Sequence, residues 1–97
     1  MPKYVVLINW TDQGVRNYKD TVDRWEAAQK AINAVGGRFT DIYWTVGTYD
    51  LVGIVEAPDT EALAAGLLVS AGAGNIRTTT LRAFDADEMR AVIAKTG

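Results

Sequence analysis

Two short stretches of this chain carry apolar side chains at consecutive positions, and this feature constrains the fold more than any other. Residues 3–10 read KYVVLINW, and residues 49–57 read YDLVGIVEA. Successive side chains of a strand point to opposite faces, so Val6 and Ile8 share one face while Leu7 lies on the other. A strand that is apolar on both faces is covered on both faces in the folded protein. We therefore expect both stretches to be central strands of a sheet.

Strand and helix signals alternate along the rest of the chain. Apolar residues from Val22 to Val35 recur at spacings of three and four, which predicts an amphipathic helix packed on the sheet. The expected elements are strands at 3–10, 38–46, 49–57 and 75–84, and helices that begin near Asp20, Asp59 and Asp85, the last with capping-box spacing. This βαββαβ order with a short C-terminal helix predicts one ferredoxin-like α+β domain, residues 1–97, around an antiparallel sheet.

Two helices can cover only one face of a four-stranded sheet, so the second apolar face needs another partner. Left exposed, it would be a large adhesive patch on a lone chain. The simplest cover is the same face of a second copy. We therefore expect a homodimer through the sheet face, or a larger homo-oligomer built on such dimers. Light scattering that shows a monomer at micromolar concentration would overturn this expectation.

Composition removes several function classes. The chain has no cysteine and no histidine, so it lacks thiolate metal sites, a cysteine nucleophile, the usual base near neutral pH and a histidine haem ligand. Its carboxylates show no calcium-loop spacing, and we expect neither metal nor cofactor. A net charge of −2 gives no field that attracts nucleic acid. Because no apolar run approaches about 20 residues and no signal-peptide cleavage site is present, we expect a cytoplasmic protein without membrane contact.

Four segments of the chain match a known family in the same order. They are YVVLINWTDQG near the N-terminus, YWTVGTYD in the middle, VEAP, and RTTTLRAF near the C-terminus. Together they resemble the GYD domain family of small bacterial and archaeal proteins over about residues 3–94. The resemblance implies the fold of the dimeric α+β barrels, which have ferredoxin-like topology and pair face to face. It implies no activity, because the broader relatives include cofactor-independent monooxygenases, haem enzymes and amino-acid-sensing modules.

The motif of that family stands here as Gly47-Thr48-Tyr49-Asp50. Gly47 and Thr48 fit a two-residue type II′ hairpin turn, and counting outward from the turn places Thr45 opposite Asp50. Tyr49 and Asp50 then point to opposite faces of the sheet, which argues against a Tyr-Asp pair acting on one substrate. We expect Asp50 to accept a hydrogen bond from Thr45 or from backbone N–H groups near the turn. The alternative is that Asp50 borders a cavity, where burial would make it a base.

Polar and aromatic side chains near this turn and after the first strand are candidates for binding a small ligand. Asn9 is an amide in a buried strand, so it needs partners in the following loop or on a ligand. Gly53 either makes room for a bulky neighbour such as Trp44 or leaves the floor of a pocket open. The candidate ligand-binding residues are Asn9, Trp10, Thr11, Tyr43, Trp44, Tyr49, Asp50 and Arg77.

Three functions are compatible with the sequence. The first is a homo-oligomeric binding or sensing module that holds a small molecule beside the sheet. The second is a cofactor-independent, monooxygenase-like enzyme for a small aromatic or carbonyl compound, with Asp50 or Asn9 as the polar group. The third is assembly alone. The absence of histidine and cysteine favours binding over catalysis, and the tryptophans and tyrosines favour a pocket.

Overall fold

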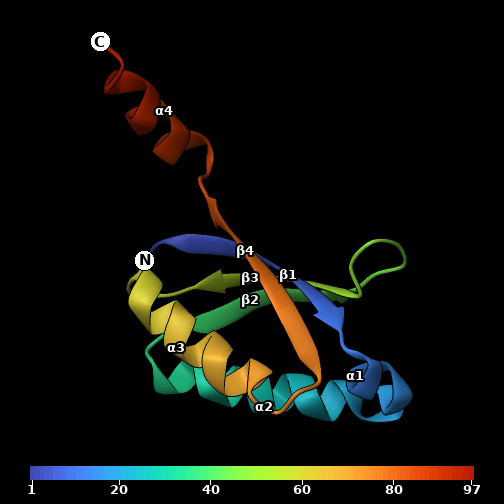
Figure 1. The fold of residues 1–97 in the computed structure, drawn as a ribbon. Helices are drawn as coiled ribbons and strands as arrows, with labels where there is room; N and C mark the ends of the chain where they lie inside the picture. Colours follow the sequence, from blue (N-terminus) through green and yellow to red (C-terminus); the bar gives the residue numbers. More distant parts are fainter.

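The computed structural model describes residues 1–97 and has the predicted order of strands and helices (Figure 1). Its strands are β1 (Lys3–Trp10), β2 (Arg38–Trp44), β3 (Leu51–Glu56) and β4 (Ile76–Ala83). Its helices are α1 (Asp12–Arg16), α2 (Thr21–Ala34), α3 (Thr60–Ala71) and α4 (Ala86–Ala94), and a 3-10 turn, η1 (Tyr18–Asp20), precedes α2. None of these helices combines the length and the apolarity that a membrane span requires.

The four strands form one antiparallel sheet in the order β2-β3-β1-β4. The two doubly apolar strands, β1 and β3, lie in its centre, as the sequence predicts. Val6 at the middle of β1 lies opposite Gly53 of β3 and Thr80 of β4. The topology is therefore ferredoxin-like, with a fourth helix after the last strand.

The helix boundaries follow the predicted caps. Asp59 accepts a hydrogen bond from the Ala62 N–H at 2.8 Å and begins α3. Asp20 precedes α2 at the expected position, although its side chain makes no capping bond. Gly36 follows α2 with a φ of 85°, the left-handed conformation that glycine supplies at helix ends. Short polar residues and glycine thus set where the helices start and stop.

Helices α2 and α3 cover one face of the sheet, and the hydrophobic core lies between them and that face (Figure 1). The helices contribute Ile32 and Leu63, both almost completely buried. A Cβ placed on Gly66 of α3 would lie 2.7 Å from Ile32 Cδ1, so the two helices approach as closely as glycine permits. The sheet contributes Tyr4, Val6, Ile8, Leu51 and Val55.

The opposite face of the sheet has no helix over it. Its apolar side chains are Val5, Leu7, Val52, Ile54 and Leu81, and we call this surface the open face. The first four are half-buried, and Leu81 on the edge strand is exposed. A single chain therefore leaves this apolar surface uncovered. It is the surface that the sequence predicts to be covered by a second copy.

Helix α4 projects away from the rest of the molecule (Figure 1) and packs closely against no other helix or strand. A capping box begins it: the Asp85 carboxylate accepts from the Glu88 N–H at 2.8 Å, and the Glu88 carboxylate accepts from the Asp85 N–H at 3.1 Å. The Glu88 N–H, together with the Lys3 ammonium 3.4 Å away, holds the pKa of Asp85 below its usual value. The first turn of α4 is thus well formed, with contacts from Lys3 and Arg82, although no helix or strand packs on the rest of it.

Replacing Ile32 by alanine tests the position of the core. Because Ile32 is fully buried between α2, α3 and the sheet, Ile32→Ala should lower the free energy of unfolding by about 2–5 kcal/mol. Val22→Ala is the matched control, since Val22 lies on the same helix with half of its surface exposed, and it should change stability by no more than about 0.5 kcal/mol. Urea unfolding monitored by circular dichroism measures both, and equal effects would contradict this core.

Candidate functional site

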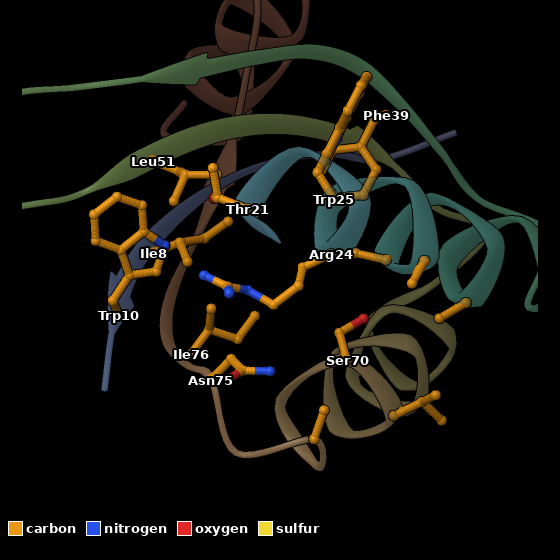
Figure 2. A pocket seen from close by; sticks show the side chains of 15 residues that line it. Ile8, Trp10, Thr21, Arg24, Trp25, Phe39, Leu51, Ser70, Asn75 and Ile76 are labelled. Atoms are coloured by element: carbon orange, nitrogen blue, oxygen red, sulfur yellow. The ribbon is translucent and has the colours of Figure 1, made fainter. Parts of the chain in front are cut away.

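A pocket of about 180 Å³ lies between the helix-covered face of the sheet, α2 and the end of α3 (Figure 2). Eleven of its fifteen lining residues are hydrophobic. β1 contributes Ile8 and Trp10, and α2 contributes Thr21, Arg24 and Trp25. The side chains that α2 and α3 contribute to this lining include the small Ala28, Ala31 and Ser70, which leave the space unfilled.

Arg24 is the one ionisable side chain that lines the pocket. Figure 2 shows it reaching across the space toward Ile76 and Asn75. Its guanidinium donates to the backbone carbonyls of Asn17, at 2.6 Å, and Gly14, at 3.0 Å. It takes part in none of the ion pairs of the chain. A half-buried cation with five N–H donors therefore retains unused donors and has no anionic partner.

Trp25 of α2 lines the pocket and contacts Trp44 of β2, which lies outside the lining. The rings of Trp25 and Trp44 meet edge to face, with centroids 6.0 Å apart and an angle of 81° between their planes. The Trp44 indole N–H donates to the Thr21 hydroxyl at 2.9 Å. The Trp25 indole nitrogen is buried and has no hydrogen-bond partner. A buried donor without a partner is unusual, and the ring of Trp25, not its inaccessible N–H, forms part of the pocket lining.

The segment after β1 and the loop before β4 are locked together at one end of the pocket. Thr11 caps α1 by accepting from the Gly14 N–H at 3.1 Å, and its hydroxyl donates to the Gly74 carbonyl at 2.6 Å. A Cβ on Gly14 would lie 2.0 Å from the Asn75 carbonyl oxygen. Only glycine permits this approach, so Gly14 fixes the position of Asn75, which lines the pocket.

The expected type II′ hairpin is wrong. β2 ends at Trp44 and β3 begins at Leu51, and the segment between them is a wider loop with no backbone hydrogen bond joining Val46 and Tyr49. Gly47 has a φ of 143°, far from the roughly +60° of a type II′ turn. Asp50 is instead bonded to β1: its N–H donates to the Ile8 carbonyl at 2.9 Å and its carboxylate accepts from the Trp10 N–H at 2.8 Å. The residue is thus directed to β1 and does not close a tight turn.

The Asp50 carboxylate therefore accepts from a backbone N–H, as expected, but this N–H belongs to Trp10 at the end of β1 and not to the turn. The strand register next to the loop is the one counted from the sequence: Thr45 lies opposite Asp50 and donates its N–H to the Asp50 carbonyl at 2.9 Å. The Thr45 hydroxyl does not reach the Asp50 carboxylate and donates to the Tyr49 carbonyl at 2.5 Å. The motif fastens the start of β3 to the end of β1, and so positions Trp10 at the pocket.

The structure separates the candidate residues into groups. Trp10 lines the pocket, Trp44 contacts two of its lining residues, and Asp50 binds the backbone of Trp10. Thr11 caps α1 beside the pocket. The remaining four lie elsewhere: Asn9 and Tyr43 on strand positions that alternate with the core face, Tyr49 half-buried in the loop, and Arg77 in a shallow groove beside α3. Their roles in binding stay predictions.

Several pocket residues are not among the sequence candidates. The apolar stripe of α2 passes through Trp25, so the sequence pattern assigns this residue to the core and gives Arg24 no role. The sequence pattern that could have identified these residues is Thr21, Arg24 and Trp25 within the first five positions of that helix. Gly53 leaves no pocket floor open: a Cβ there would lie 3.0 Å from the ring of Phe39, so Gly53 makes room for Phe39 and not for Trp44.

The lining residues suit binding better than proton transfer. An arginine guanidinium cannot be deprotonated in proteins, and no carboxylate or tyrosine lines the pocket. No group of three or more aspartates and glutamates is placed to hold a metal ion. What the pocket offers is an apolar volume and one fixed positive charge.

Comparison with known proteins places the chain among relatives of similar length. The family model described as GYD domain matches residues 4–93. The chain is 34% identical over 85 residues to a Thermus thermophilus protein named glutamine synthetase and cystathionine beta-lyase binding protein, covering 87% of this chain and 90% of that relative. It is also similar to the crystal structure of TTHA0845 from Thermus thermophilus, with a TM-score of 0.56 and 28% identity over 89% of this chain and 96% of that one.

Substitution of Asp50 tests whether the motif residue supports the pocket. Asp50→Ala removes the acceptor of the Trp10 N–H and should lower the free energy of unfolding by about 1–3 kcal/mol. Asp50→Asn keeps an acceptor oxygen and should cost less than half as much. Glu26→Ala, an exposed position on α2 away from the open face, is the control and should have almost no effect. Chemical denaturation measures all three. An Asp50→Ala variant as stable as the control would show that the hydrogen bond from the Trp10 N–H does not stabilise the fold.

Proposed function

The chain belongs to the GYD domain family, and we propose that it is a homo-oligomeric binding module whose pocket holds a small apolar molecule with one acidic group. The observation that carries the proposal is the guanidinium of Arg24, half-buried beside an apolar pocket and without an anionic partner. Its two bonds to backbone carbonyls leave other N–H donors free, and a ligand carboxylate would engage them in charge-assisted hydrogen bonds.

The size and lining of the pocket narrow the ligand class. An apolar cavity of about 150 Å³ accommodates benzene, so a pocket of about 180 Å³ suits one ring, or a short branched chain, with one small substituent. The acid would meet Arg24, and the apolar body would lie against Trp10, Trp25 and Ile8. Catalysis of a monooxygenase type finds less support, since the pocket holds no group that exchanges protons.

Assembly through the open face completes the proposed module. Two copies that stack these faces would bury Leu7, Ile54 and their neighbours, which a single chain leaves half-buried. Because the pocket lies on the opposite, helix-covered side of the sheet, pairing would leave it accessible in each copy. The sheet then links two pockets through one shared layer, as a sensing module requires.

Binding of benzoate tests the ligand class. The chain has three tryptophans, so a ¹H–¹⁵N NMR spectrum shows three indole signals, and Trp25→Phe identifies one of them. Benzoate should move the Trp25 signal in a saturable manner. Benzyl alcohol, which has the same ring without the charge, should bind about 10–100-fold more weakly, because a hydrogen bond to a charged group is worth about 1.5–3 kcal/mol. Equal affinities would show that Arg24 selects no acid.

A variant that fills the pocket separates binding there from binding elsewhere. Ala28→Leu places a larger side chain at the pocket wall and should abolish the shift of the Trp25 signal by benzoate. Ala64→Leu, an exposed position on α3 outside this pocket, is the matched control and should bind as the natural chain does. If the natural chain binds neither benzoate nor benzyl alcohol, the small-molecule proposal fails.

A second candidate function is the binding of other proteins, and the printed name of the Thermus relative favours it. Leu68 and Val69 on α3 are 74% and 69% exposed, and Leu68 lines a shallow groove with Ala64, Leu67 and Arg77. Apolar groups next to an arginine are common in protein interfaces. We infer that this groove would contact a partner enzyme.

Purified glutamine synthetase from the same organism tests the second candidate. Binding to the immobilised chain, measured by surface plasmon resonance, should be weakened at least about 10-fold by Leu68→Glu, because a buried leucine contributes about 1.5–3 kcal/mol. Ala65→Glu, on the same helix outside the groove, is the control. No binding by the natural chain would remove glutamine synthetase as a partner.

A further inference from the structure

Helix α4 has an apolar stripe without a partner in its own chain. Met89, Val92 and Ile93 lie at spacings of three and four and are 45%, 37% and 56% exposed. Asp87 and Arg90, which pair with each other at 2.7 Å, occupy another side of the helix. A helix that is apolar on one side and polar on another normally packs its apolar side against a neighbour.

The length of α4 makes the lack of a partner informative. It has nine residues, and isolated helices shorter than about 12–15 residues are marginal in water. Its capping box stabilises only the first turn. The radius of gyration of the chain is 14.5 Å, whereas a compact chain of this length has about 12.5 Å. Beyond its first turn, such an extended arm would gain stability from contact with another molecule.

The direction of α4 identifies that molecule. Figure 1 shows α2 and α3 on one side of the sheet and α4 beyond the sheet on the other side. A copy stacked on the open face would therefore lie alongside α4. The base of the arm is held in this direction, since the Arg82 guanidinium lies 3.7 Å from the Glu88 carboxylate and 4.5 Å from the centre of the Phe84 ring.

We propose that α4 is an exchanged arm: in the homodimer, the α4 stripe of each copy packs against the flank of the other copy. The inference rests on the proposed pairing through the open face and adds a second contact to it. The open face is about 19 Å wide and 20 Å long, so its projected area is only about 400 Å². Stable interfaces bury about 800 Å² per partner. Two reciprocal arms enlarge the contact without a new binding surface on the sheet.

A single charge on the stripe tests the arm. Ile93→Glu should raise the dissociation constant of the dimer at least about 100-fold, because burial of one isoleucine is worth about tenfold or more and a twofold dimer loses it twice. Ala91→Glu adds the same charge to the same helix away from the stripe, and should leave the constant within about threefold. Sedimentation velocity over a dilution series measures both. Equal dissociation constants for the two variants would overturn the proposal.

Two further measurements keep the arm distinct from the sheet contact. Amide hydrogens of α4 should exchange slowly in the concentrated natural chain and rapidly in Ile93→Glu, while those of β1 stay protected in both. Leu7→Lys, on the open face, should also give a monomer. A natural chain that is already monomeric would refute the pairing through the open face, and the arm with it. A dimer that Leu7→Lys disrupts and Ile93→Glu leaves unchanged would refute the arm alone.

Discussion

The packing of α2 and α3 on a single face of the sheet is the contact on which the rest of the structure depends. Ile32 and Leu63 meet Val6 and Val55 there, and the approach of the two helices is as close as Gly66 permits. Because both helices are committed to this face, the other face has no cover within the chain. Where small side chains of both helices line the space, a pocket remains beside Trp10. The core therefore determines both surfaces available for function.

Strand and helix positions could be predicted from the sequence because local signals agree with the packing. The double apolarity of 3–10 and 49–57 indicates two strands at the centre of the sheet, and Asp59 and Asp85 begin helices as their spacing predicts. The hairpin turn could not be predicted in this way. Its local sequence fits a type II′ turn, but Asp50 makes two bonds to β1, a strand about 40 positions away in sequence. A long-range bond overrode a local preference.

The pocket illustrates the same limit. Trp10 could be proposed from sequence because it ends a strand next to a polar loop. Arg24 and Trp25 could not, because a helical stripe identifies which side of α2 faces the sheet without showing where the sheet ends beneath it. Likewise the neighbour of Gly53 is Phe39 and not Trp44, since the irregular pairing between Phe39 and Asp41 changes which side chain lies over the glycine.

Arg24 also has a second attachment whose consequence reaches beyond the pocket. Its guanidinium binds the carbonyls of Gly14 and Asn17, which belong to the segment that Thr11 and Gly14 press against the loop before β4. In the proposed binding module this side chain would take part in two equilibria, the ordering of that segment and the occupation of the pocket by an anion. By thermodynamic linkage, whatever tightens the segment would then change the affinity for the anion, and the anion would change the order of the segment by the same factor. The surface around α1 is thus where another molecule could detect that the pocket is occupied.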